Sequence, residues 1–212
     1  MKSLLMASKV ALDPLLVNIP LDGSLVDLKG RMSPTVMGYP NGIPVFEEID
    51  GRQALKVSVN VGVRFQQPSD IDKLFSTDTW ALEFEVRFLD PTVYKHDSIL
   101  GVRKSTALND YTMAFWKRAQ SGNRVIMTGT DSKSETTPVL IEAVAPTALV
   151  WRKYRVEHSK TGTTRTLKFF VNGTQVGSKV VVGDYSADII DILWTPNPNP
   201  FNGWIRDLKV YR

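Results

Sequence analysis

The sequence of 212 residues contains no cysteine. This absence excludes structural disulfides, thiolate nucleophiles and cysteine-ligated metal sites, and it disfavours a secreted lectin held together by disulfides. Helix signals are nearly absent as well, because only Ser3–Leu12 could form a short helix before Pro14 ends it. We therefore expect a chain built mainly of β-strands.

Long apolar runs are also missing. No segment approaches the ~18 consecutive apolar residues that a membrane-spanning helix needs, so we expect no transmembrane segment and no membrane partner. Near the N-terminus, Lys9 and Asp13 interrupt the apolar stretch and Pro14 follows. A signal peptide requires an uninterrupted apolar core, so none is expected, and the chain is expected to be made in a cytoplasm and not exported by the usual route.

Charge of one sign is not concentrated anywhere. The 26 Lys and Arg residues are scattered among 22 Asp and Glu residues, which gives a net charge of +4. The densest basic run, Arg152–Arg155, alternates as the exposed face of a strand does. Nucleic-acid binding would require a clustered basic stripe within a known module, and neither is present, so no nucleic-acid partner is expected.

What the sequence does contain is strict alternation of apolar and polar residues. Lys56–Phe65 places its valines and Phe65 on one face, and Thr79–Phe88 does the same with Trp80, Leu82 and its other apolar residues, which predicts two half-buried antiparallel strands. Further strands are predicted at Ser98–Arg103, Tyr111–Trp116, Arg124–Met127, Val139–Ile141, Tyr154–His158, Thr166–Asn172, Lys179–Val182, Ile189–Leu193 and Ile205–Tyr211. Many short strands separated by turn residues indicate a sandwich or barrel.

Two local features refine this picture. Asn172-Gly173 lies between two apolar strands, and both residues tolerate positive φ, so a type I′ hairpin is predicted there. In Ile205–Tyr211, Ile205 and Leu208 cannot share a face at a period of two, so we expect a bulge or a change of face.

The order of several core and turn motifs resembles the concanavalin A-like lectin/glucanase superfamily, in particular its laminin G-like branch. The segments that carry the resemblance are Ile19–Ser24, Gly51–Val57, Thr79–Val86, Trp151–Val156, Leu167–Gly173 and Phe201–Tyr211. The resemblance implies an all-β chain folded as a two-sheet antiparallel β-sandwich, the concanavalin A-like jelly roll, over residues 17–212, with residues 1–16 as an N-terminal arm.

The glucanases of that superfamily carry two glutamates and an aspartate close to E-x-D-x-x-E. Here Glu47–Asp50 supplies only E-x-D and is expected to lie in a turn before a strand. Glu83 and Glu85 share a strand face that the resemblance makes an outer, solvated one. The two histidines, His96 and His158, lie on separate elements, and His158 is expected to face solvent. No catalytic residue is nominated, and we expect a chain that is not an enzyme.

Calcium is the ion that the resemblance makes conceivable, because related folds hold it with loop carboxylates and carbonyls. Five aspartates lie in or near predicted loops: Asp22, Asp27, Asp110, Asp131 and Asp207. They lack a dense Asp/Asn run, and the competing interpretation is that they serve turns and caps. No metal ligands and no cofactor are therefore assigned, and bound calcium stays open.

Tryptophan gives the best indication of ligand binding. Trp80 and Trp151 are interpreted as structural. Trp116 is expected on the face opposite Tyr111, Met113 and Phe115. Indole rings beside amides suit stacking on a sugar, which makes four residues candidate ligand contacts: Trp116, Trp194, Asn197 and Asn199. Packing under a loop or at a subunit contact would explain the same residues.

The arm is rich in apolar residues for a free tail, and we expect it to dock on its own sandwich or on a neighbouring subunit. Its candidate assembly residues are Leu4, Leu5, Met6, Val10 and Leu12. The favoured function is a non-catalytic virion structural protein, capsid-decorating or tail-associated in a bacteriophage, which assembles in the host cytoplasm as a homo-oligomer or with other virion proteins. The alternative is a carbohydrate-binding module for receptor glycans, and a glycan hydrolase comes third.

Overall fold

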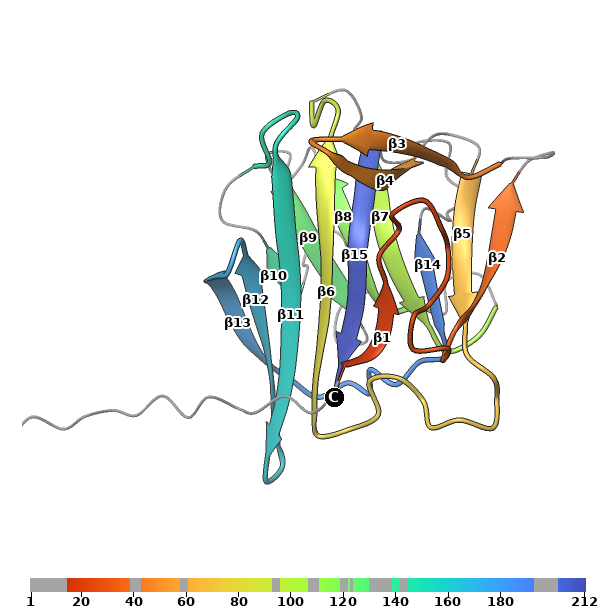
Figure 1. Ribbon diagram of the computed structural model, residues 1–212. Coiled ribbons are helices and arrows are strands. Elements are labelled where there is room, and N and C mark those ends of the chain that lie inside the picture. The colour runs from red at the N-terminus through yellow and green to blue at the C-terminus, as the bar shows by residue number, and fades with distance from the viewer. Residues whose placement is uncertain are drawn as a thin grey trace, which may run out of the picture.

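The computed structural model describes residues 15–38, 43–57, 61–92, 96–106, 111–118, 122, 124–129, 139–141, 145–192 and 202–212. These residues form β-strands joined by turns and loops (Figure 1). The strands are β1 (Leu15–Ile19), β2 (Ser33–Gly38), β3 (Val45–Ile49), β4 (Arg52–Val57), β5 (Val61–Gln66), β6 (Thr79–Phe88), β7 (His96–Arg103), β8 (Tyr111–Arg118), β9 (Arg124–Gly129), β10 (Leu140–Ile141), β11 (Trp151–Thr161), β12 (Thr164–Val171), β13 (Thr174–Val181), β14 (Ile189–Ile192) and β15 (Gly203–Tyr211).

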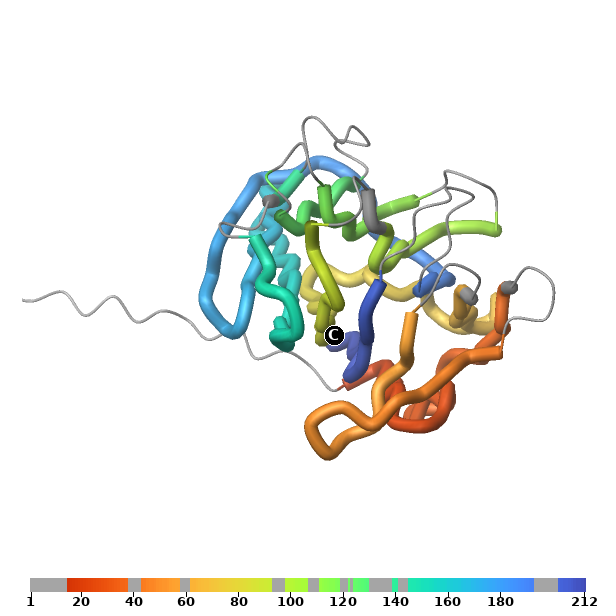
Figure 2. Tube along the Cα trace, turned by 90° about the horizontal axis from the view of Figure 1, so that it is seen from above, coloured from red at the N-terminus to blue at the C-terminus, as the bar shows by residue number. Residues whose placement is uncertain are grey.

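The strands make two antiparallel sheets that pack face to face. One sheet has eight strands in the order β13-β12-β11-β6-β15-β4-β3, with β1 paired to β15, and the other has seven in the order β10-β9-β8-β7-β14-β5-β2. Seen from above, β11, β6 and β15 follow one another along one layer, and β8 and β7 lie in the other (Figure 2). The predicted two-sheet antiparallel β-sandwich is confirmed.

The core lies between the sheets, and β6 shows why the alternation predicts it. Trp80, Leu82, Phe84, Val86 and Phe88 all point inward and are buried. The facing strand β8 contributes Phe115, and β12 of the same sheet as β6 contributes Phe169. The ring centroids of Phe84 and Phe115 lie 5.0 Å apart, edge to face. The inward faces of both sheets thus share one apolar layer, which is the main stabilising term of such a fold.

The predicted strand Lys56–Phe65 is wrong as a single element. Its first residues end β4 in the eight-stranded sheet, and its last residues lie in β5 of the seven-stranded sheet. Val57 and Phe65 nevertheless both point into the core. Alternation is preserved because the two sheets face the same interior, so the pattern does not reveal where the chain crosses between them.

The predicted turn at Glu47–Asp50 is also wrong, because most of this segment is strand. Glu47 and Glu48 lie in β3 and pair with Ala54 and Gln53 of β4. The Glu47 carboxylate accepts hydrogen bonds from Lys56 Nζ at 2.6 Å and from Trp204 Nε1 at 2.9 Å. These two bonds, that from Lys56 first, lower the pKa of Glu47.

Both predicted backbone irregularities are present. Asn172 and Gly173 have φ values of 49° and 80°, as the turn between β12 and β13 requires. In β15 the register against β6 shifts between Arg206 and Lys209, and Asp207 has a φ of 53°. This bulge lets Ile205 and Leu208 both reach the core.

The N-terminal strand β1 begins at Leu15, which pairs with Tyr211 of β15. The candidate arm residues Leu4, Leu5, Met6, Val10 and Leu12 lie outside the described residues, as does the predicted helix Ser3–Leu12. In the described ranges, no helix is long and apolar enough to cross a membrane.

Candidate functional site

Trp116 lies on the outer face of the seven-stranded sheet, in β8, and is half-buried. Its indole Nε1 donates a hydrogen bond to Thr128 Oγ1 of β9 at 3.1 Å, and the guanidinium of Arg118 lies 5.5 Å from its ring centroid. The other three predicted ligand residues, Trp194, Asn197 and Asn199, lie outside the described residues. The structure therefore places one of the four.

Tyr111 lies on the same face as Trp116, so the prediction that the two face opposite ways is wrong. Their ring centroids are 6.2 Å apart, edge to face. The register between β7 and β8 shifts where Arg103 pairs with Tyr111, and this irregularity turns the Tyr111 side chain outward. Its ring covers Gly101 so closely that a Cβ there would overlap it.

A charged network lies beside these aromatic rings. The Arg103 guanidinium lies 4.3 Å from the Tyr111 centroid and its Nε is 3.3 Å from Asp191 Oδ2. Arg64 pairs with the same carboxylate at 2.8 and 3.0 Å. The hydrogen bond to Asp191 raises the pKa of Arg64, and burial raises the pKa of Tyr111 against the opposing effect of Arg103.

We call Tyr111, Trp116, Thr128, Arg103 and Asp191 the Trp116 cluster. Its two aromatic rings are half-buried, whereas Thr128, Arg103 and Asp191 on the same sheet face are buried. Burial also lowers the pKa of the adjoining Arg118 to about 10. The exposed parts of the two rings can stack on the apolar face of a sugar, and the buried Thr128 and Arg103 hold the rings in place.

Glu83 and Glu85 do share an outer face, on the eight-stranded sheet, but Glu83 is buried and not solvated. It pairs with Lys153 at 2.7 Å and Arg155 at 3.2 Å, while Glu85 pairs with Arg206 at 2.7 Å. The Glu83 side chain is only 7% exposed. Each carboxylate is a partner of cations on neighbouring strands, and we assign neither a catalytic role.

A groove that sequence reasoning missed runs along this same outer face. It has a volume of about 410 Å³ and is lined in part by Arg155, Phe170 and Asn172. Phe170 and Asn172 belong to strand β12 and its turn, whereas Arg155 comes from β11. The period-two pattern identifies Phe170 as outward-facing, but it carries no information on the neighbours that hollow the surface around it.

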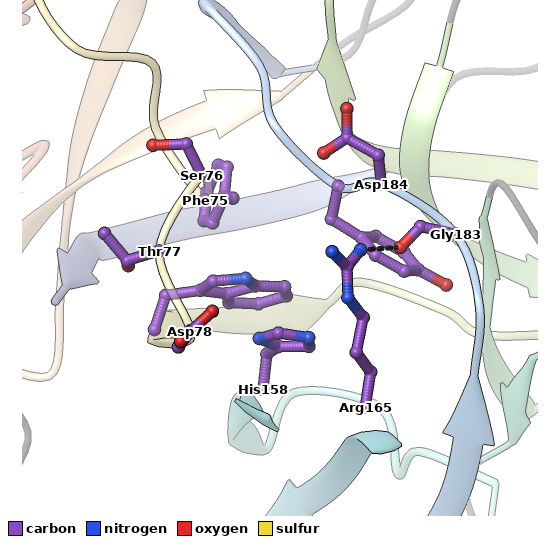
Figure 3. Close-up of a pocket in the computed structure, with 10 residues that line it drawn as sticks. Phe75, Ser76, Thr77, Asp78, His158, Arg165, Gly183 and Asp184 are labelled. Atoms are coloured by element: carbon purple, nitrogen blue, oxygen red, sulfur yellow. Dashed lines mark hydrogen bonds between the residues drawn. The ribbon is translucent and has the colours of Figure 1, made fainter. Parts of the chain in front are cut away.

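His158 is buried, so the prediction that it faces solvent is wrong. Its ring stacks on Trp80 with centroids 5.2 Å apart and planes 10° from parallel. The period-two alternation of β11 could have predicted this burial, because His158 shares a strand face with the core residues Tyr154 and Val156. Burial and nearby Arg165 lower the pKa of His158. The ring lies between Asp78 and Arg165 at the end of the sandwich where β6 begins (Figure 3).

Asp27 serves a turn, as the competing interpretation of the loop aspartates expected. Its carboxylate is buried and accepts hydrogen bonds from the backbone N–H groups of Asn18, Lys29, Arg31 and Met32, at 2.9 to 3.0 Å. Such a carboxylate has its lone pairs occupied by the protein. Across the described ranges, no group of three or more carboxylate or histidine side chains is placed to hold a metal ion.

Comparison with known proteins gives structural matches only. No protein-family model matches the sequence, and no curated protein matches it. Domain 4 of AbnA, a GH43 extracellular arabinanase from Geobacillus stearothermophilus solved in complex with arabinotriose, is similar. The TM-score is 0.67 at 16% identity, over 95% of this chain and 93% of that domain.

Botulinum neurotoxin structures are similar as well. The binding domain of botulinum neurotoxin DC, in complex with rat synaptotagmin II, has a TM-score of 0.66 at 13% identity, over 93% of this chain and 48% of its own. Botulinum neurotoxin type C, which depends upon interaction with two ganglioside molecules to enter cells, has a TM-score of 0.63 at 13% identity, over 93% of this chain and 47% of its own. This chain thus spans about half of those neurotoxin chains. At such identities the likeness shows the fold alone, a lectin-like two-sheet sandwich.

Proposed function

We propose that this chain is a non-catalytic carbohydrate-binding module that holds its ligand at the Trp116 cluster. Trp194, Asn197 and Asn199 are proposed as further contacts. The observation that carries the proposal is the pairing of Trp116 and Tyr111 on one outer sheet face, beside Arg103, Asp191 and Thr128.

The similar structures support the same class of function. The arabinanase domain was solved with arabinotriose, and the type C neurotoxin depends upon two ganglioside molecules. This chain matches nearly the whole arabinanase domain but only about half of the neurotoxin chain, so the arabinotriose complex is the stronger support for a carbohydrate ligand. Aromatic rings supply a large apolar contact at small entropic cost, and here Thr128 and Arg103 hold the two rings in place.

Titration calorimetry with arabinotriose and with ganglioside oligosaccharides tests the proposal. Trp116→Ala and Tyr111→Ala are each expected to weaken binding about tenfold or more, equivalent to roughly 1.4 kcal/mol. Phe170→Ala is the matched control, because Phe170 is a half-buried aromatic residue on the outer face of the other sheet. Unchanged affinity in both cluster variants, or loss in Phe170→Ala alone, would show that the Trp116 cluster is not the site.

The virion role stays a prediction. It depends on Leu4, Leu5, Met6, Val10 and Leu12, which lie outside the described residues, and neither the fold nor the similar structures favour it over glycan binding. A particle protein that recognises receptor glycans would satisfy both interpretations.

A further inference from the structure

Two buried polar atoms at one end of the sandwich have no hydrogen-bond partner within the described part of the chain: Trp80 Nε1 and His158 Nδ1. Their side chains are only 1% and 5% exposed. Both line one cavity of about 30 Å³, which we call the end pocket. Buried polar groups are nearly always paired, so two exceptions lining one cavity indicate a site for a partner.

The hydrogen-bonding roles of the two atoms follow from the chemistry of the two rings. Burial lowers the pKa of His158 and so favours the neutral ring, in which one nitrogen donates and the other accepts. With the proton on Nε2, Nδ1 is the acceptor. The indole Nε1–H of Trp80 is a donor only. In this tautomer the end pocket offers one donor and one acceptor.

A single hydroxyl group satisfies both atoms, since it accepts one hydrogen bond and donates another. A carboxylate could accept from Trp80 but has no proton for His158 Nδ1. A water-sized group needs about 10–15 Å³, so the pocket admits a hydroxyl or hydroxymethyl group and not a whole sugar ring.

The rim of the end pocket is polar and open to solvent. Ser76, Asp78 and Asp184 are exposed residues around it, and Arg165 stands on the opposite side from Asp78 (Figure 3). Arg165 donates a hydrogen bond to the carbonyl oxygen of Gly183 at 2.9 Å, which holds the Arg165 guanidinium in place at the rim. Hydroxyl and carboxylate groups on such a rim can pair with further hydroxyls of the same ligand.

We propose that the end pocket binds one hydroxyl or hydroxymethyl group of a carbohydrate or other polyol between Trp80 Nε1 and His158 Nδ1. The site is separate from the Trp116 cluster, which lies on the outer face of the seven-stranded sheet. Only the choice of a carbohydrate as ligand rests on the proposed function.

Nuclear magnetic resonance of the indole N–H groups tests the proposal in the full chain. L-arabinose, glycerol and sodium acetate are titrated separately, with the Trp80 indole peak assigned by its absence in Trp80→Phe. Arabinose is expected to shift that peak and acetate is not. A shift with glycerol as well would identify a general polyol site, and a shift with arabinose alone a sugar site.

His158→Phe is the informative variant, because it keeps a ring on Trp80 and removes the acceptor. It is expected to abolish the arabinose-induced shift, and Trp116→Ala is expected to keep it. Loss of glycan binding in Trp116→Ala together with an intact Trp80 shift separates the two sites. No shift with either polyol, or a shift with acetate, would overturn the proposal, and the wild-type titrations decide this even if His158→Phe folds poorly.

Discussion

Gly101 has no side chain, and the ring of Tyr111 covers it on the outer face of the seven-stranded sheet. The Tyr111 ring occupies the space where a side chain at position 101 would begin. The glycine is thus needed for close approach and not for an unusual backbone angle. This close approach holds Tyr111 beside Trp116, and it links one small residue to the geometry of the proposed glycan surface.

Gly101→Ala is expected to destabilise the fold by about 1–3 kcal/mol, because the new methyl group overlaps the Tyr111 ring. Thermal or denaturant unfolding measures the loss. Combining it with Tyr111→Ala should restore part of the stability, since the two changes share one contact. Gly177→Ala is the control, because its Cβ would make an ordinary contact of 3.5 Å with Leu140. Equal losses at the two glycines would contradict this account.

His158 should make stability depend on pH. Burial lowers its pKa below the usual value of 6.5, so the unfolded chain takes up the proton first as the pH falls. The contribution of the neutral ring is therefore complete above about pH 6.5 and is lost as the pH falls towards the lowered pKa. Unfolding free energies measured between pH 8 and 5 should decline for the wild type and decline less for His158→Phe. Parallel declines would mean that His158 does not titrate in this way.

Asp27 organises the loop that follows β1. Its carboxylate pairs with backbone N–H groups on both sides of the loop. Asp27→Ala leaves these donors without their acceptor and is expected to cost about 3 kcal/mol in denaturant unfolding. Asp27→Asn keeps one acceptor oxygen and should cost less. A loss below about 0.5 kcal/mol for the alanine variant would show that water replaces the carboxylate.

The segment Lys56–Phe65 shows what strand patterns determine. Period-two alternation reports which side chains face an apolar interior. It correctly places Val57 and Phe65 inside. The alternation does not indicate which strands pair, because a strand in either sheet of a sandwich presents the same pattern to the shared core. The crossing between the sheets is decided by contacts among strands far apart in the sequence.

We predict that residues 1–14, which precede β1, decide whether the sandwich forms an oligomer. Because β1 begins at Leu15 and pairs with β15, a chain that starts at Leu15 keeps every described strand. We expect light scattering to show a defined oligomer for the full chain and a smaller species for the shortened one. Equal masses would contradict an assembly role for the arm and leave the binding module as the simpler function.

The sequence by itself determined the class of fold, the inward face of β6, the turn at Asn172-Gly173 and the bulge in β15. Each of these depends on residues adjacent in the chain, whose chemistry constrains the backbone locally. Only the tertiary structure decided that Tyr111 stands beside Trp116, that Asp191 pairs with Arg64 and Arg103, and that His158 stacks on Trp80 above a small polar cavity. The ion pairs and the stacked rings join strands distant in the sequence, and Tyr111 is turned towards Trp116 of its own strand by the irregular register against β7. Sheet register, bulges and burial fix these contacts only when the two sheets close on one core.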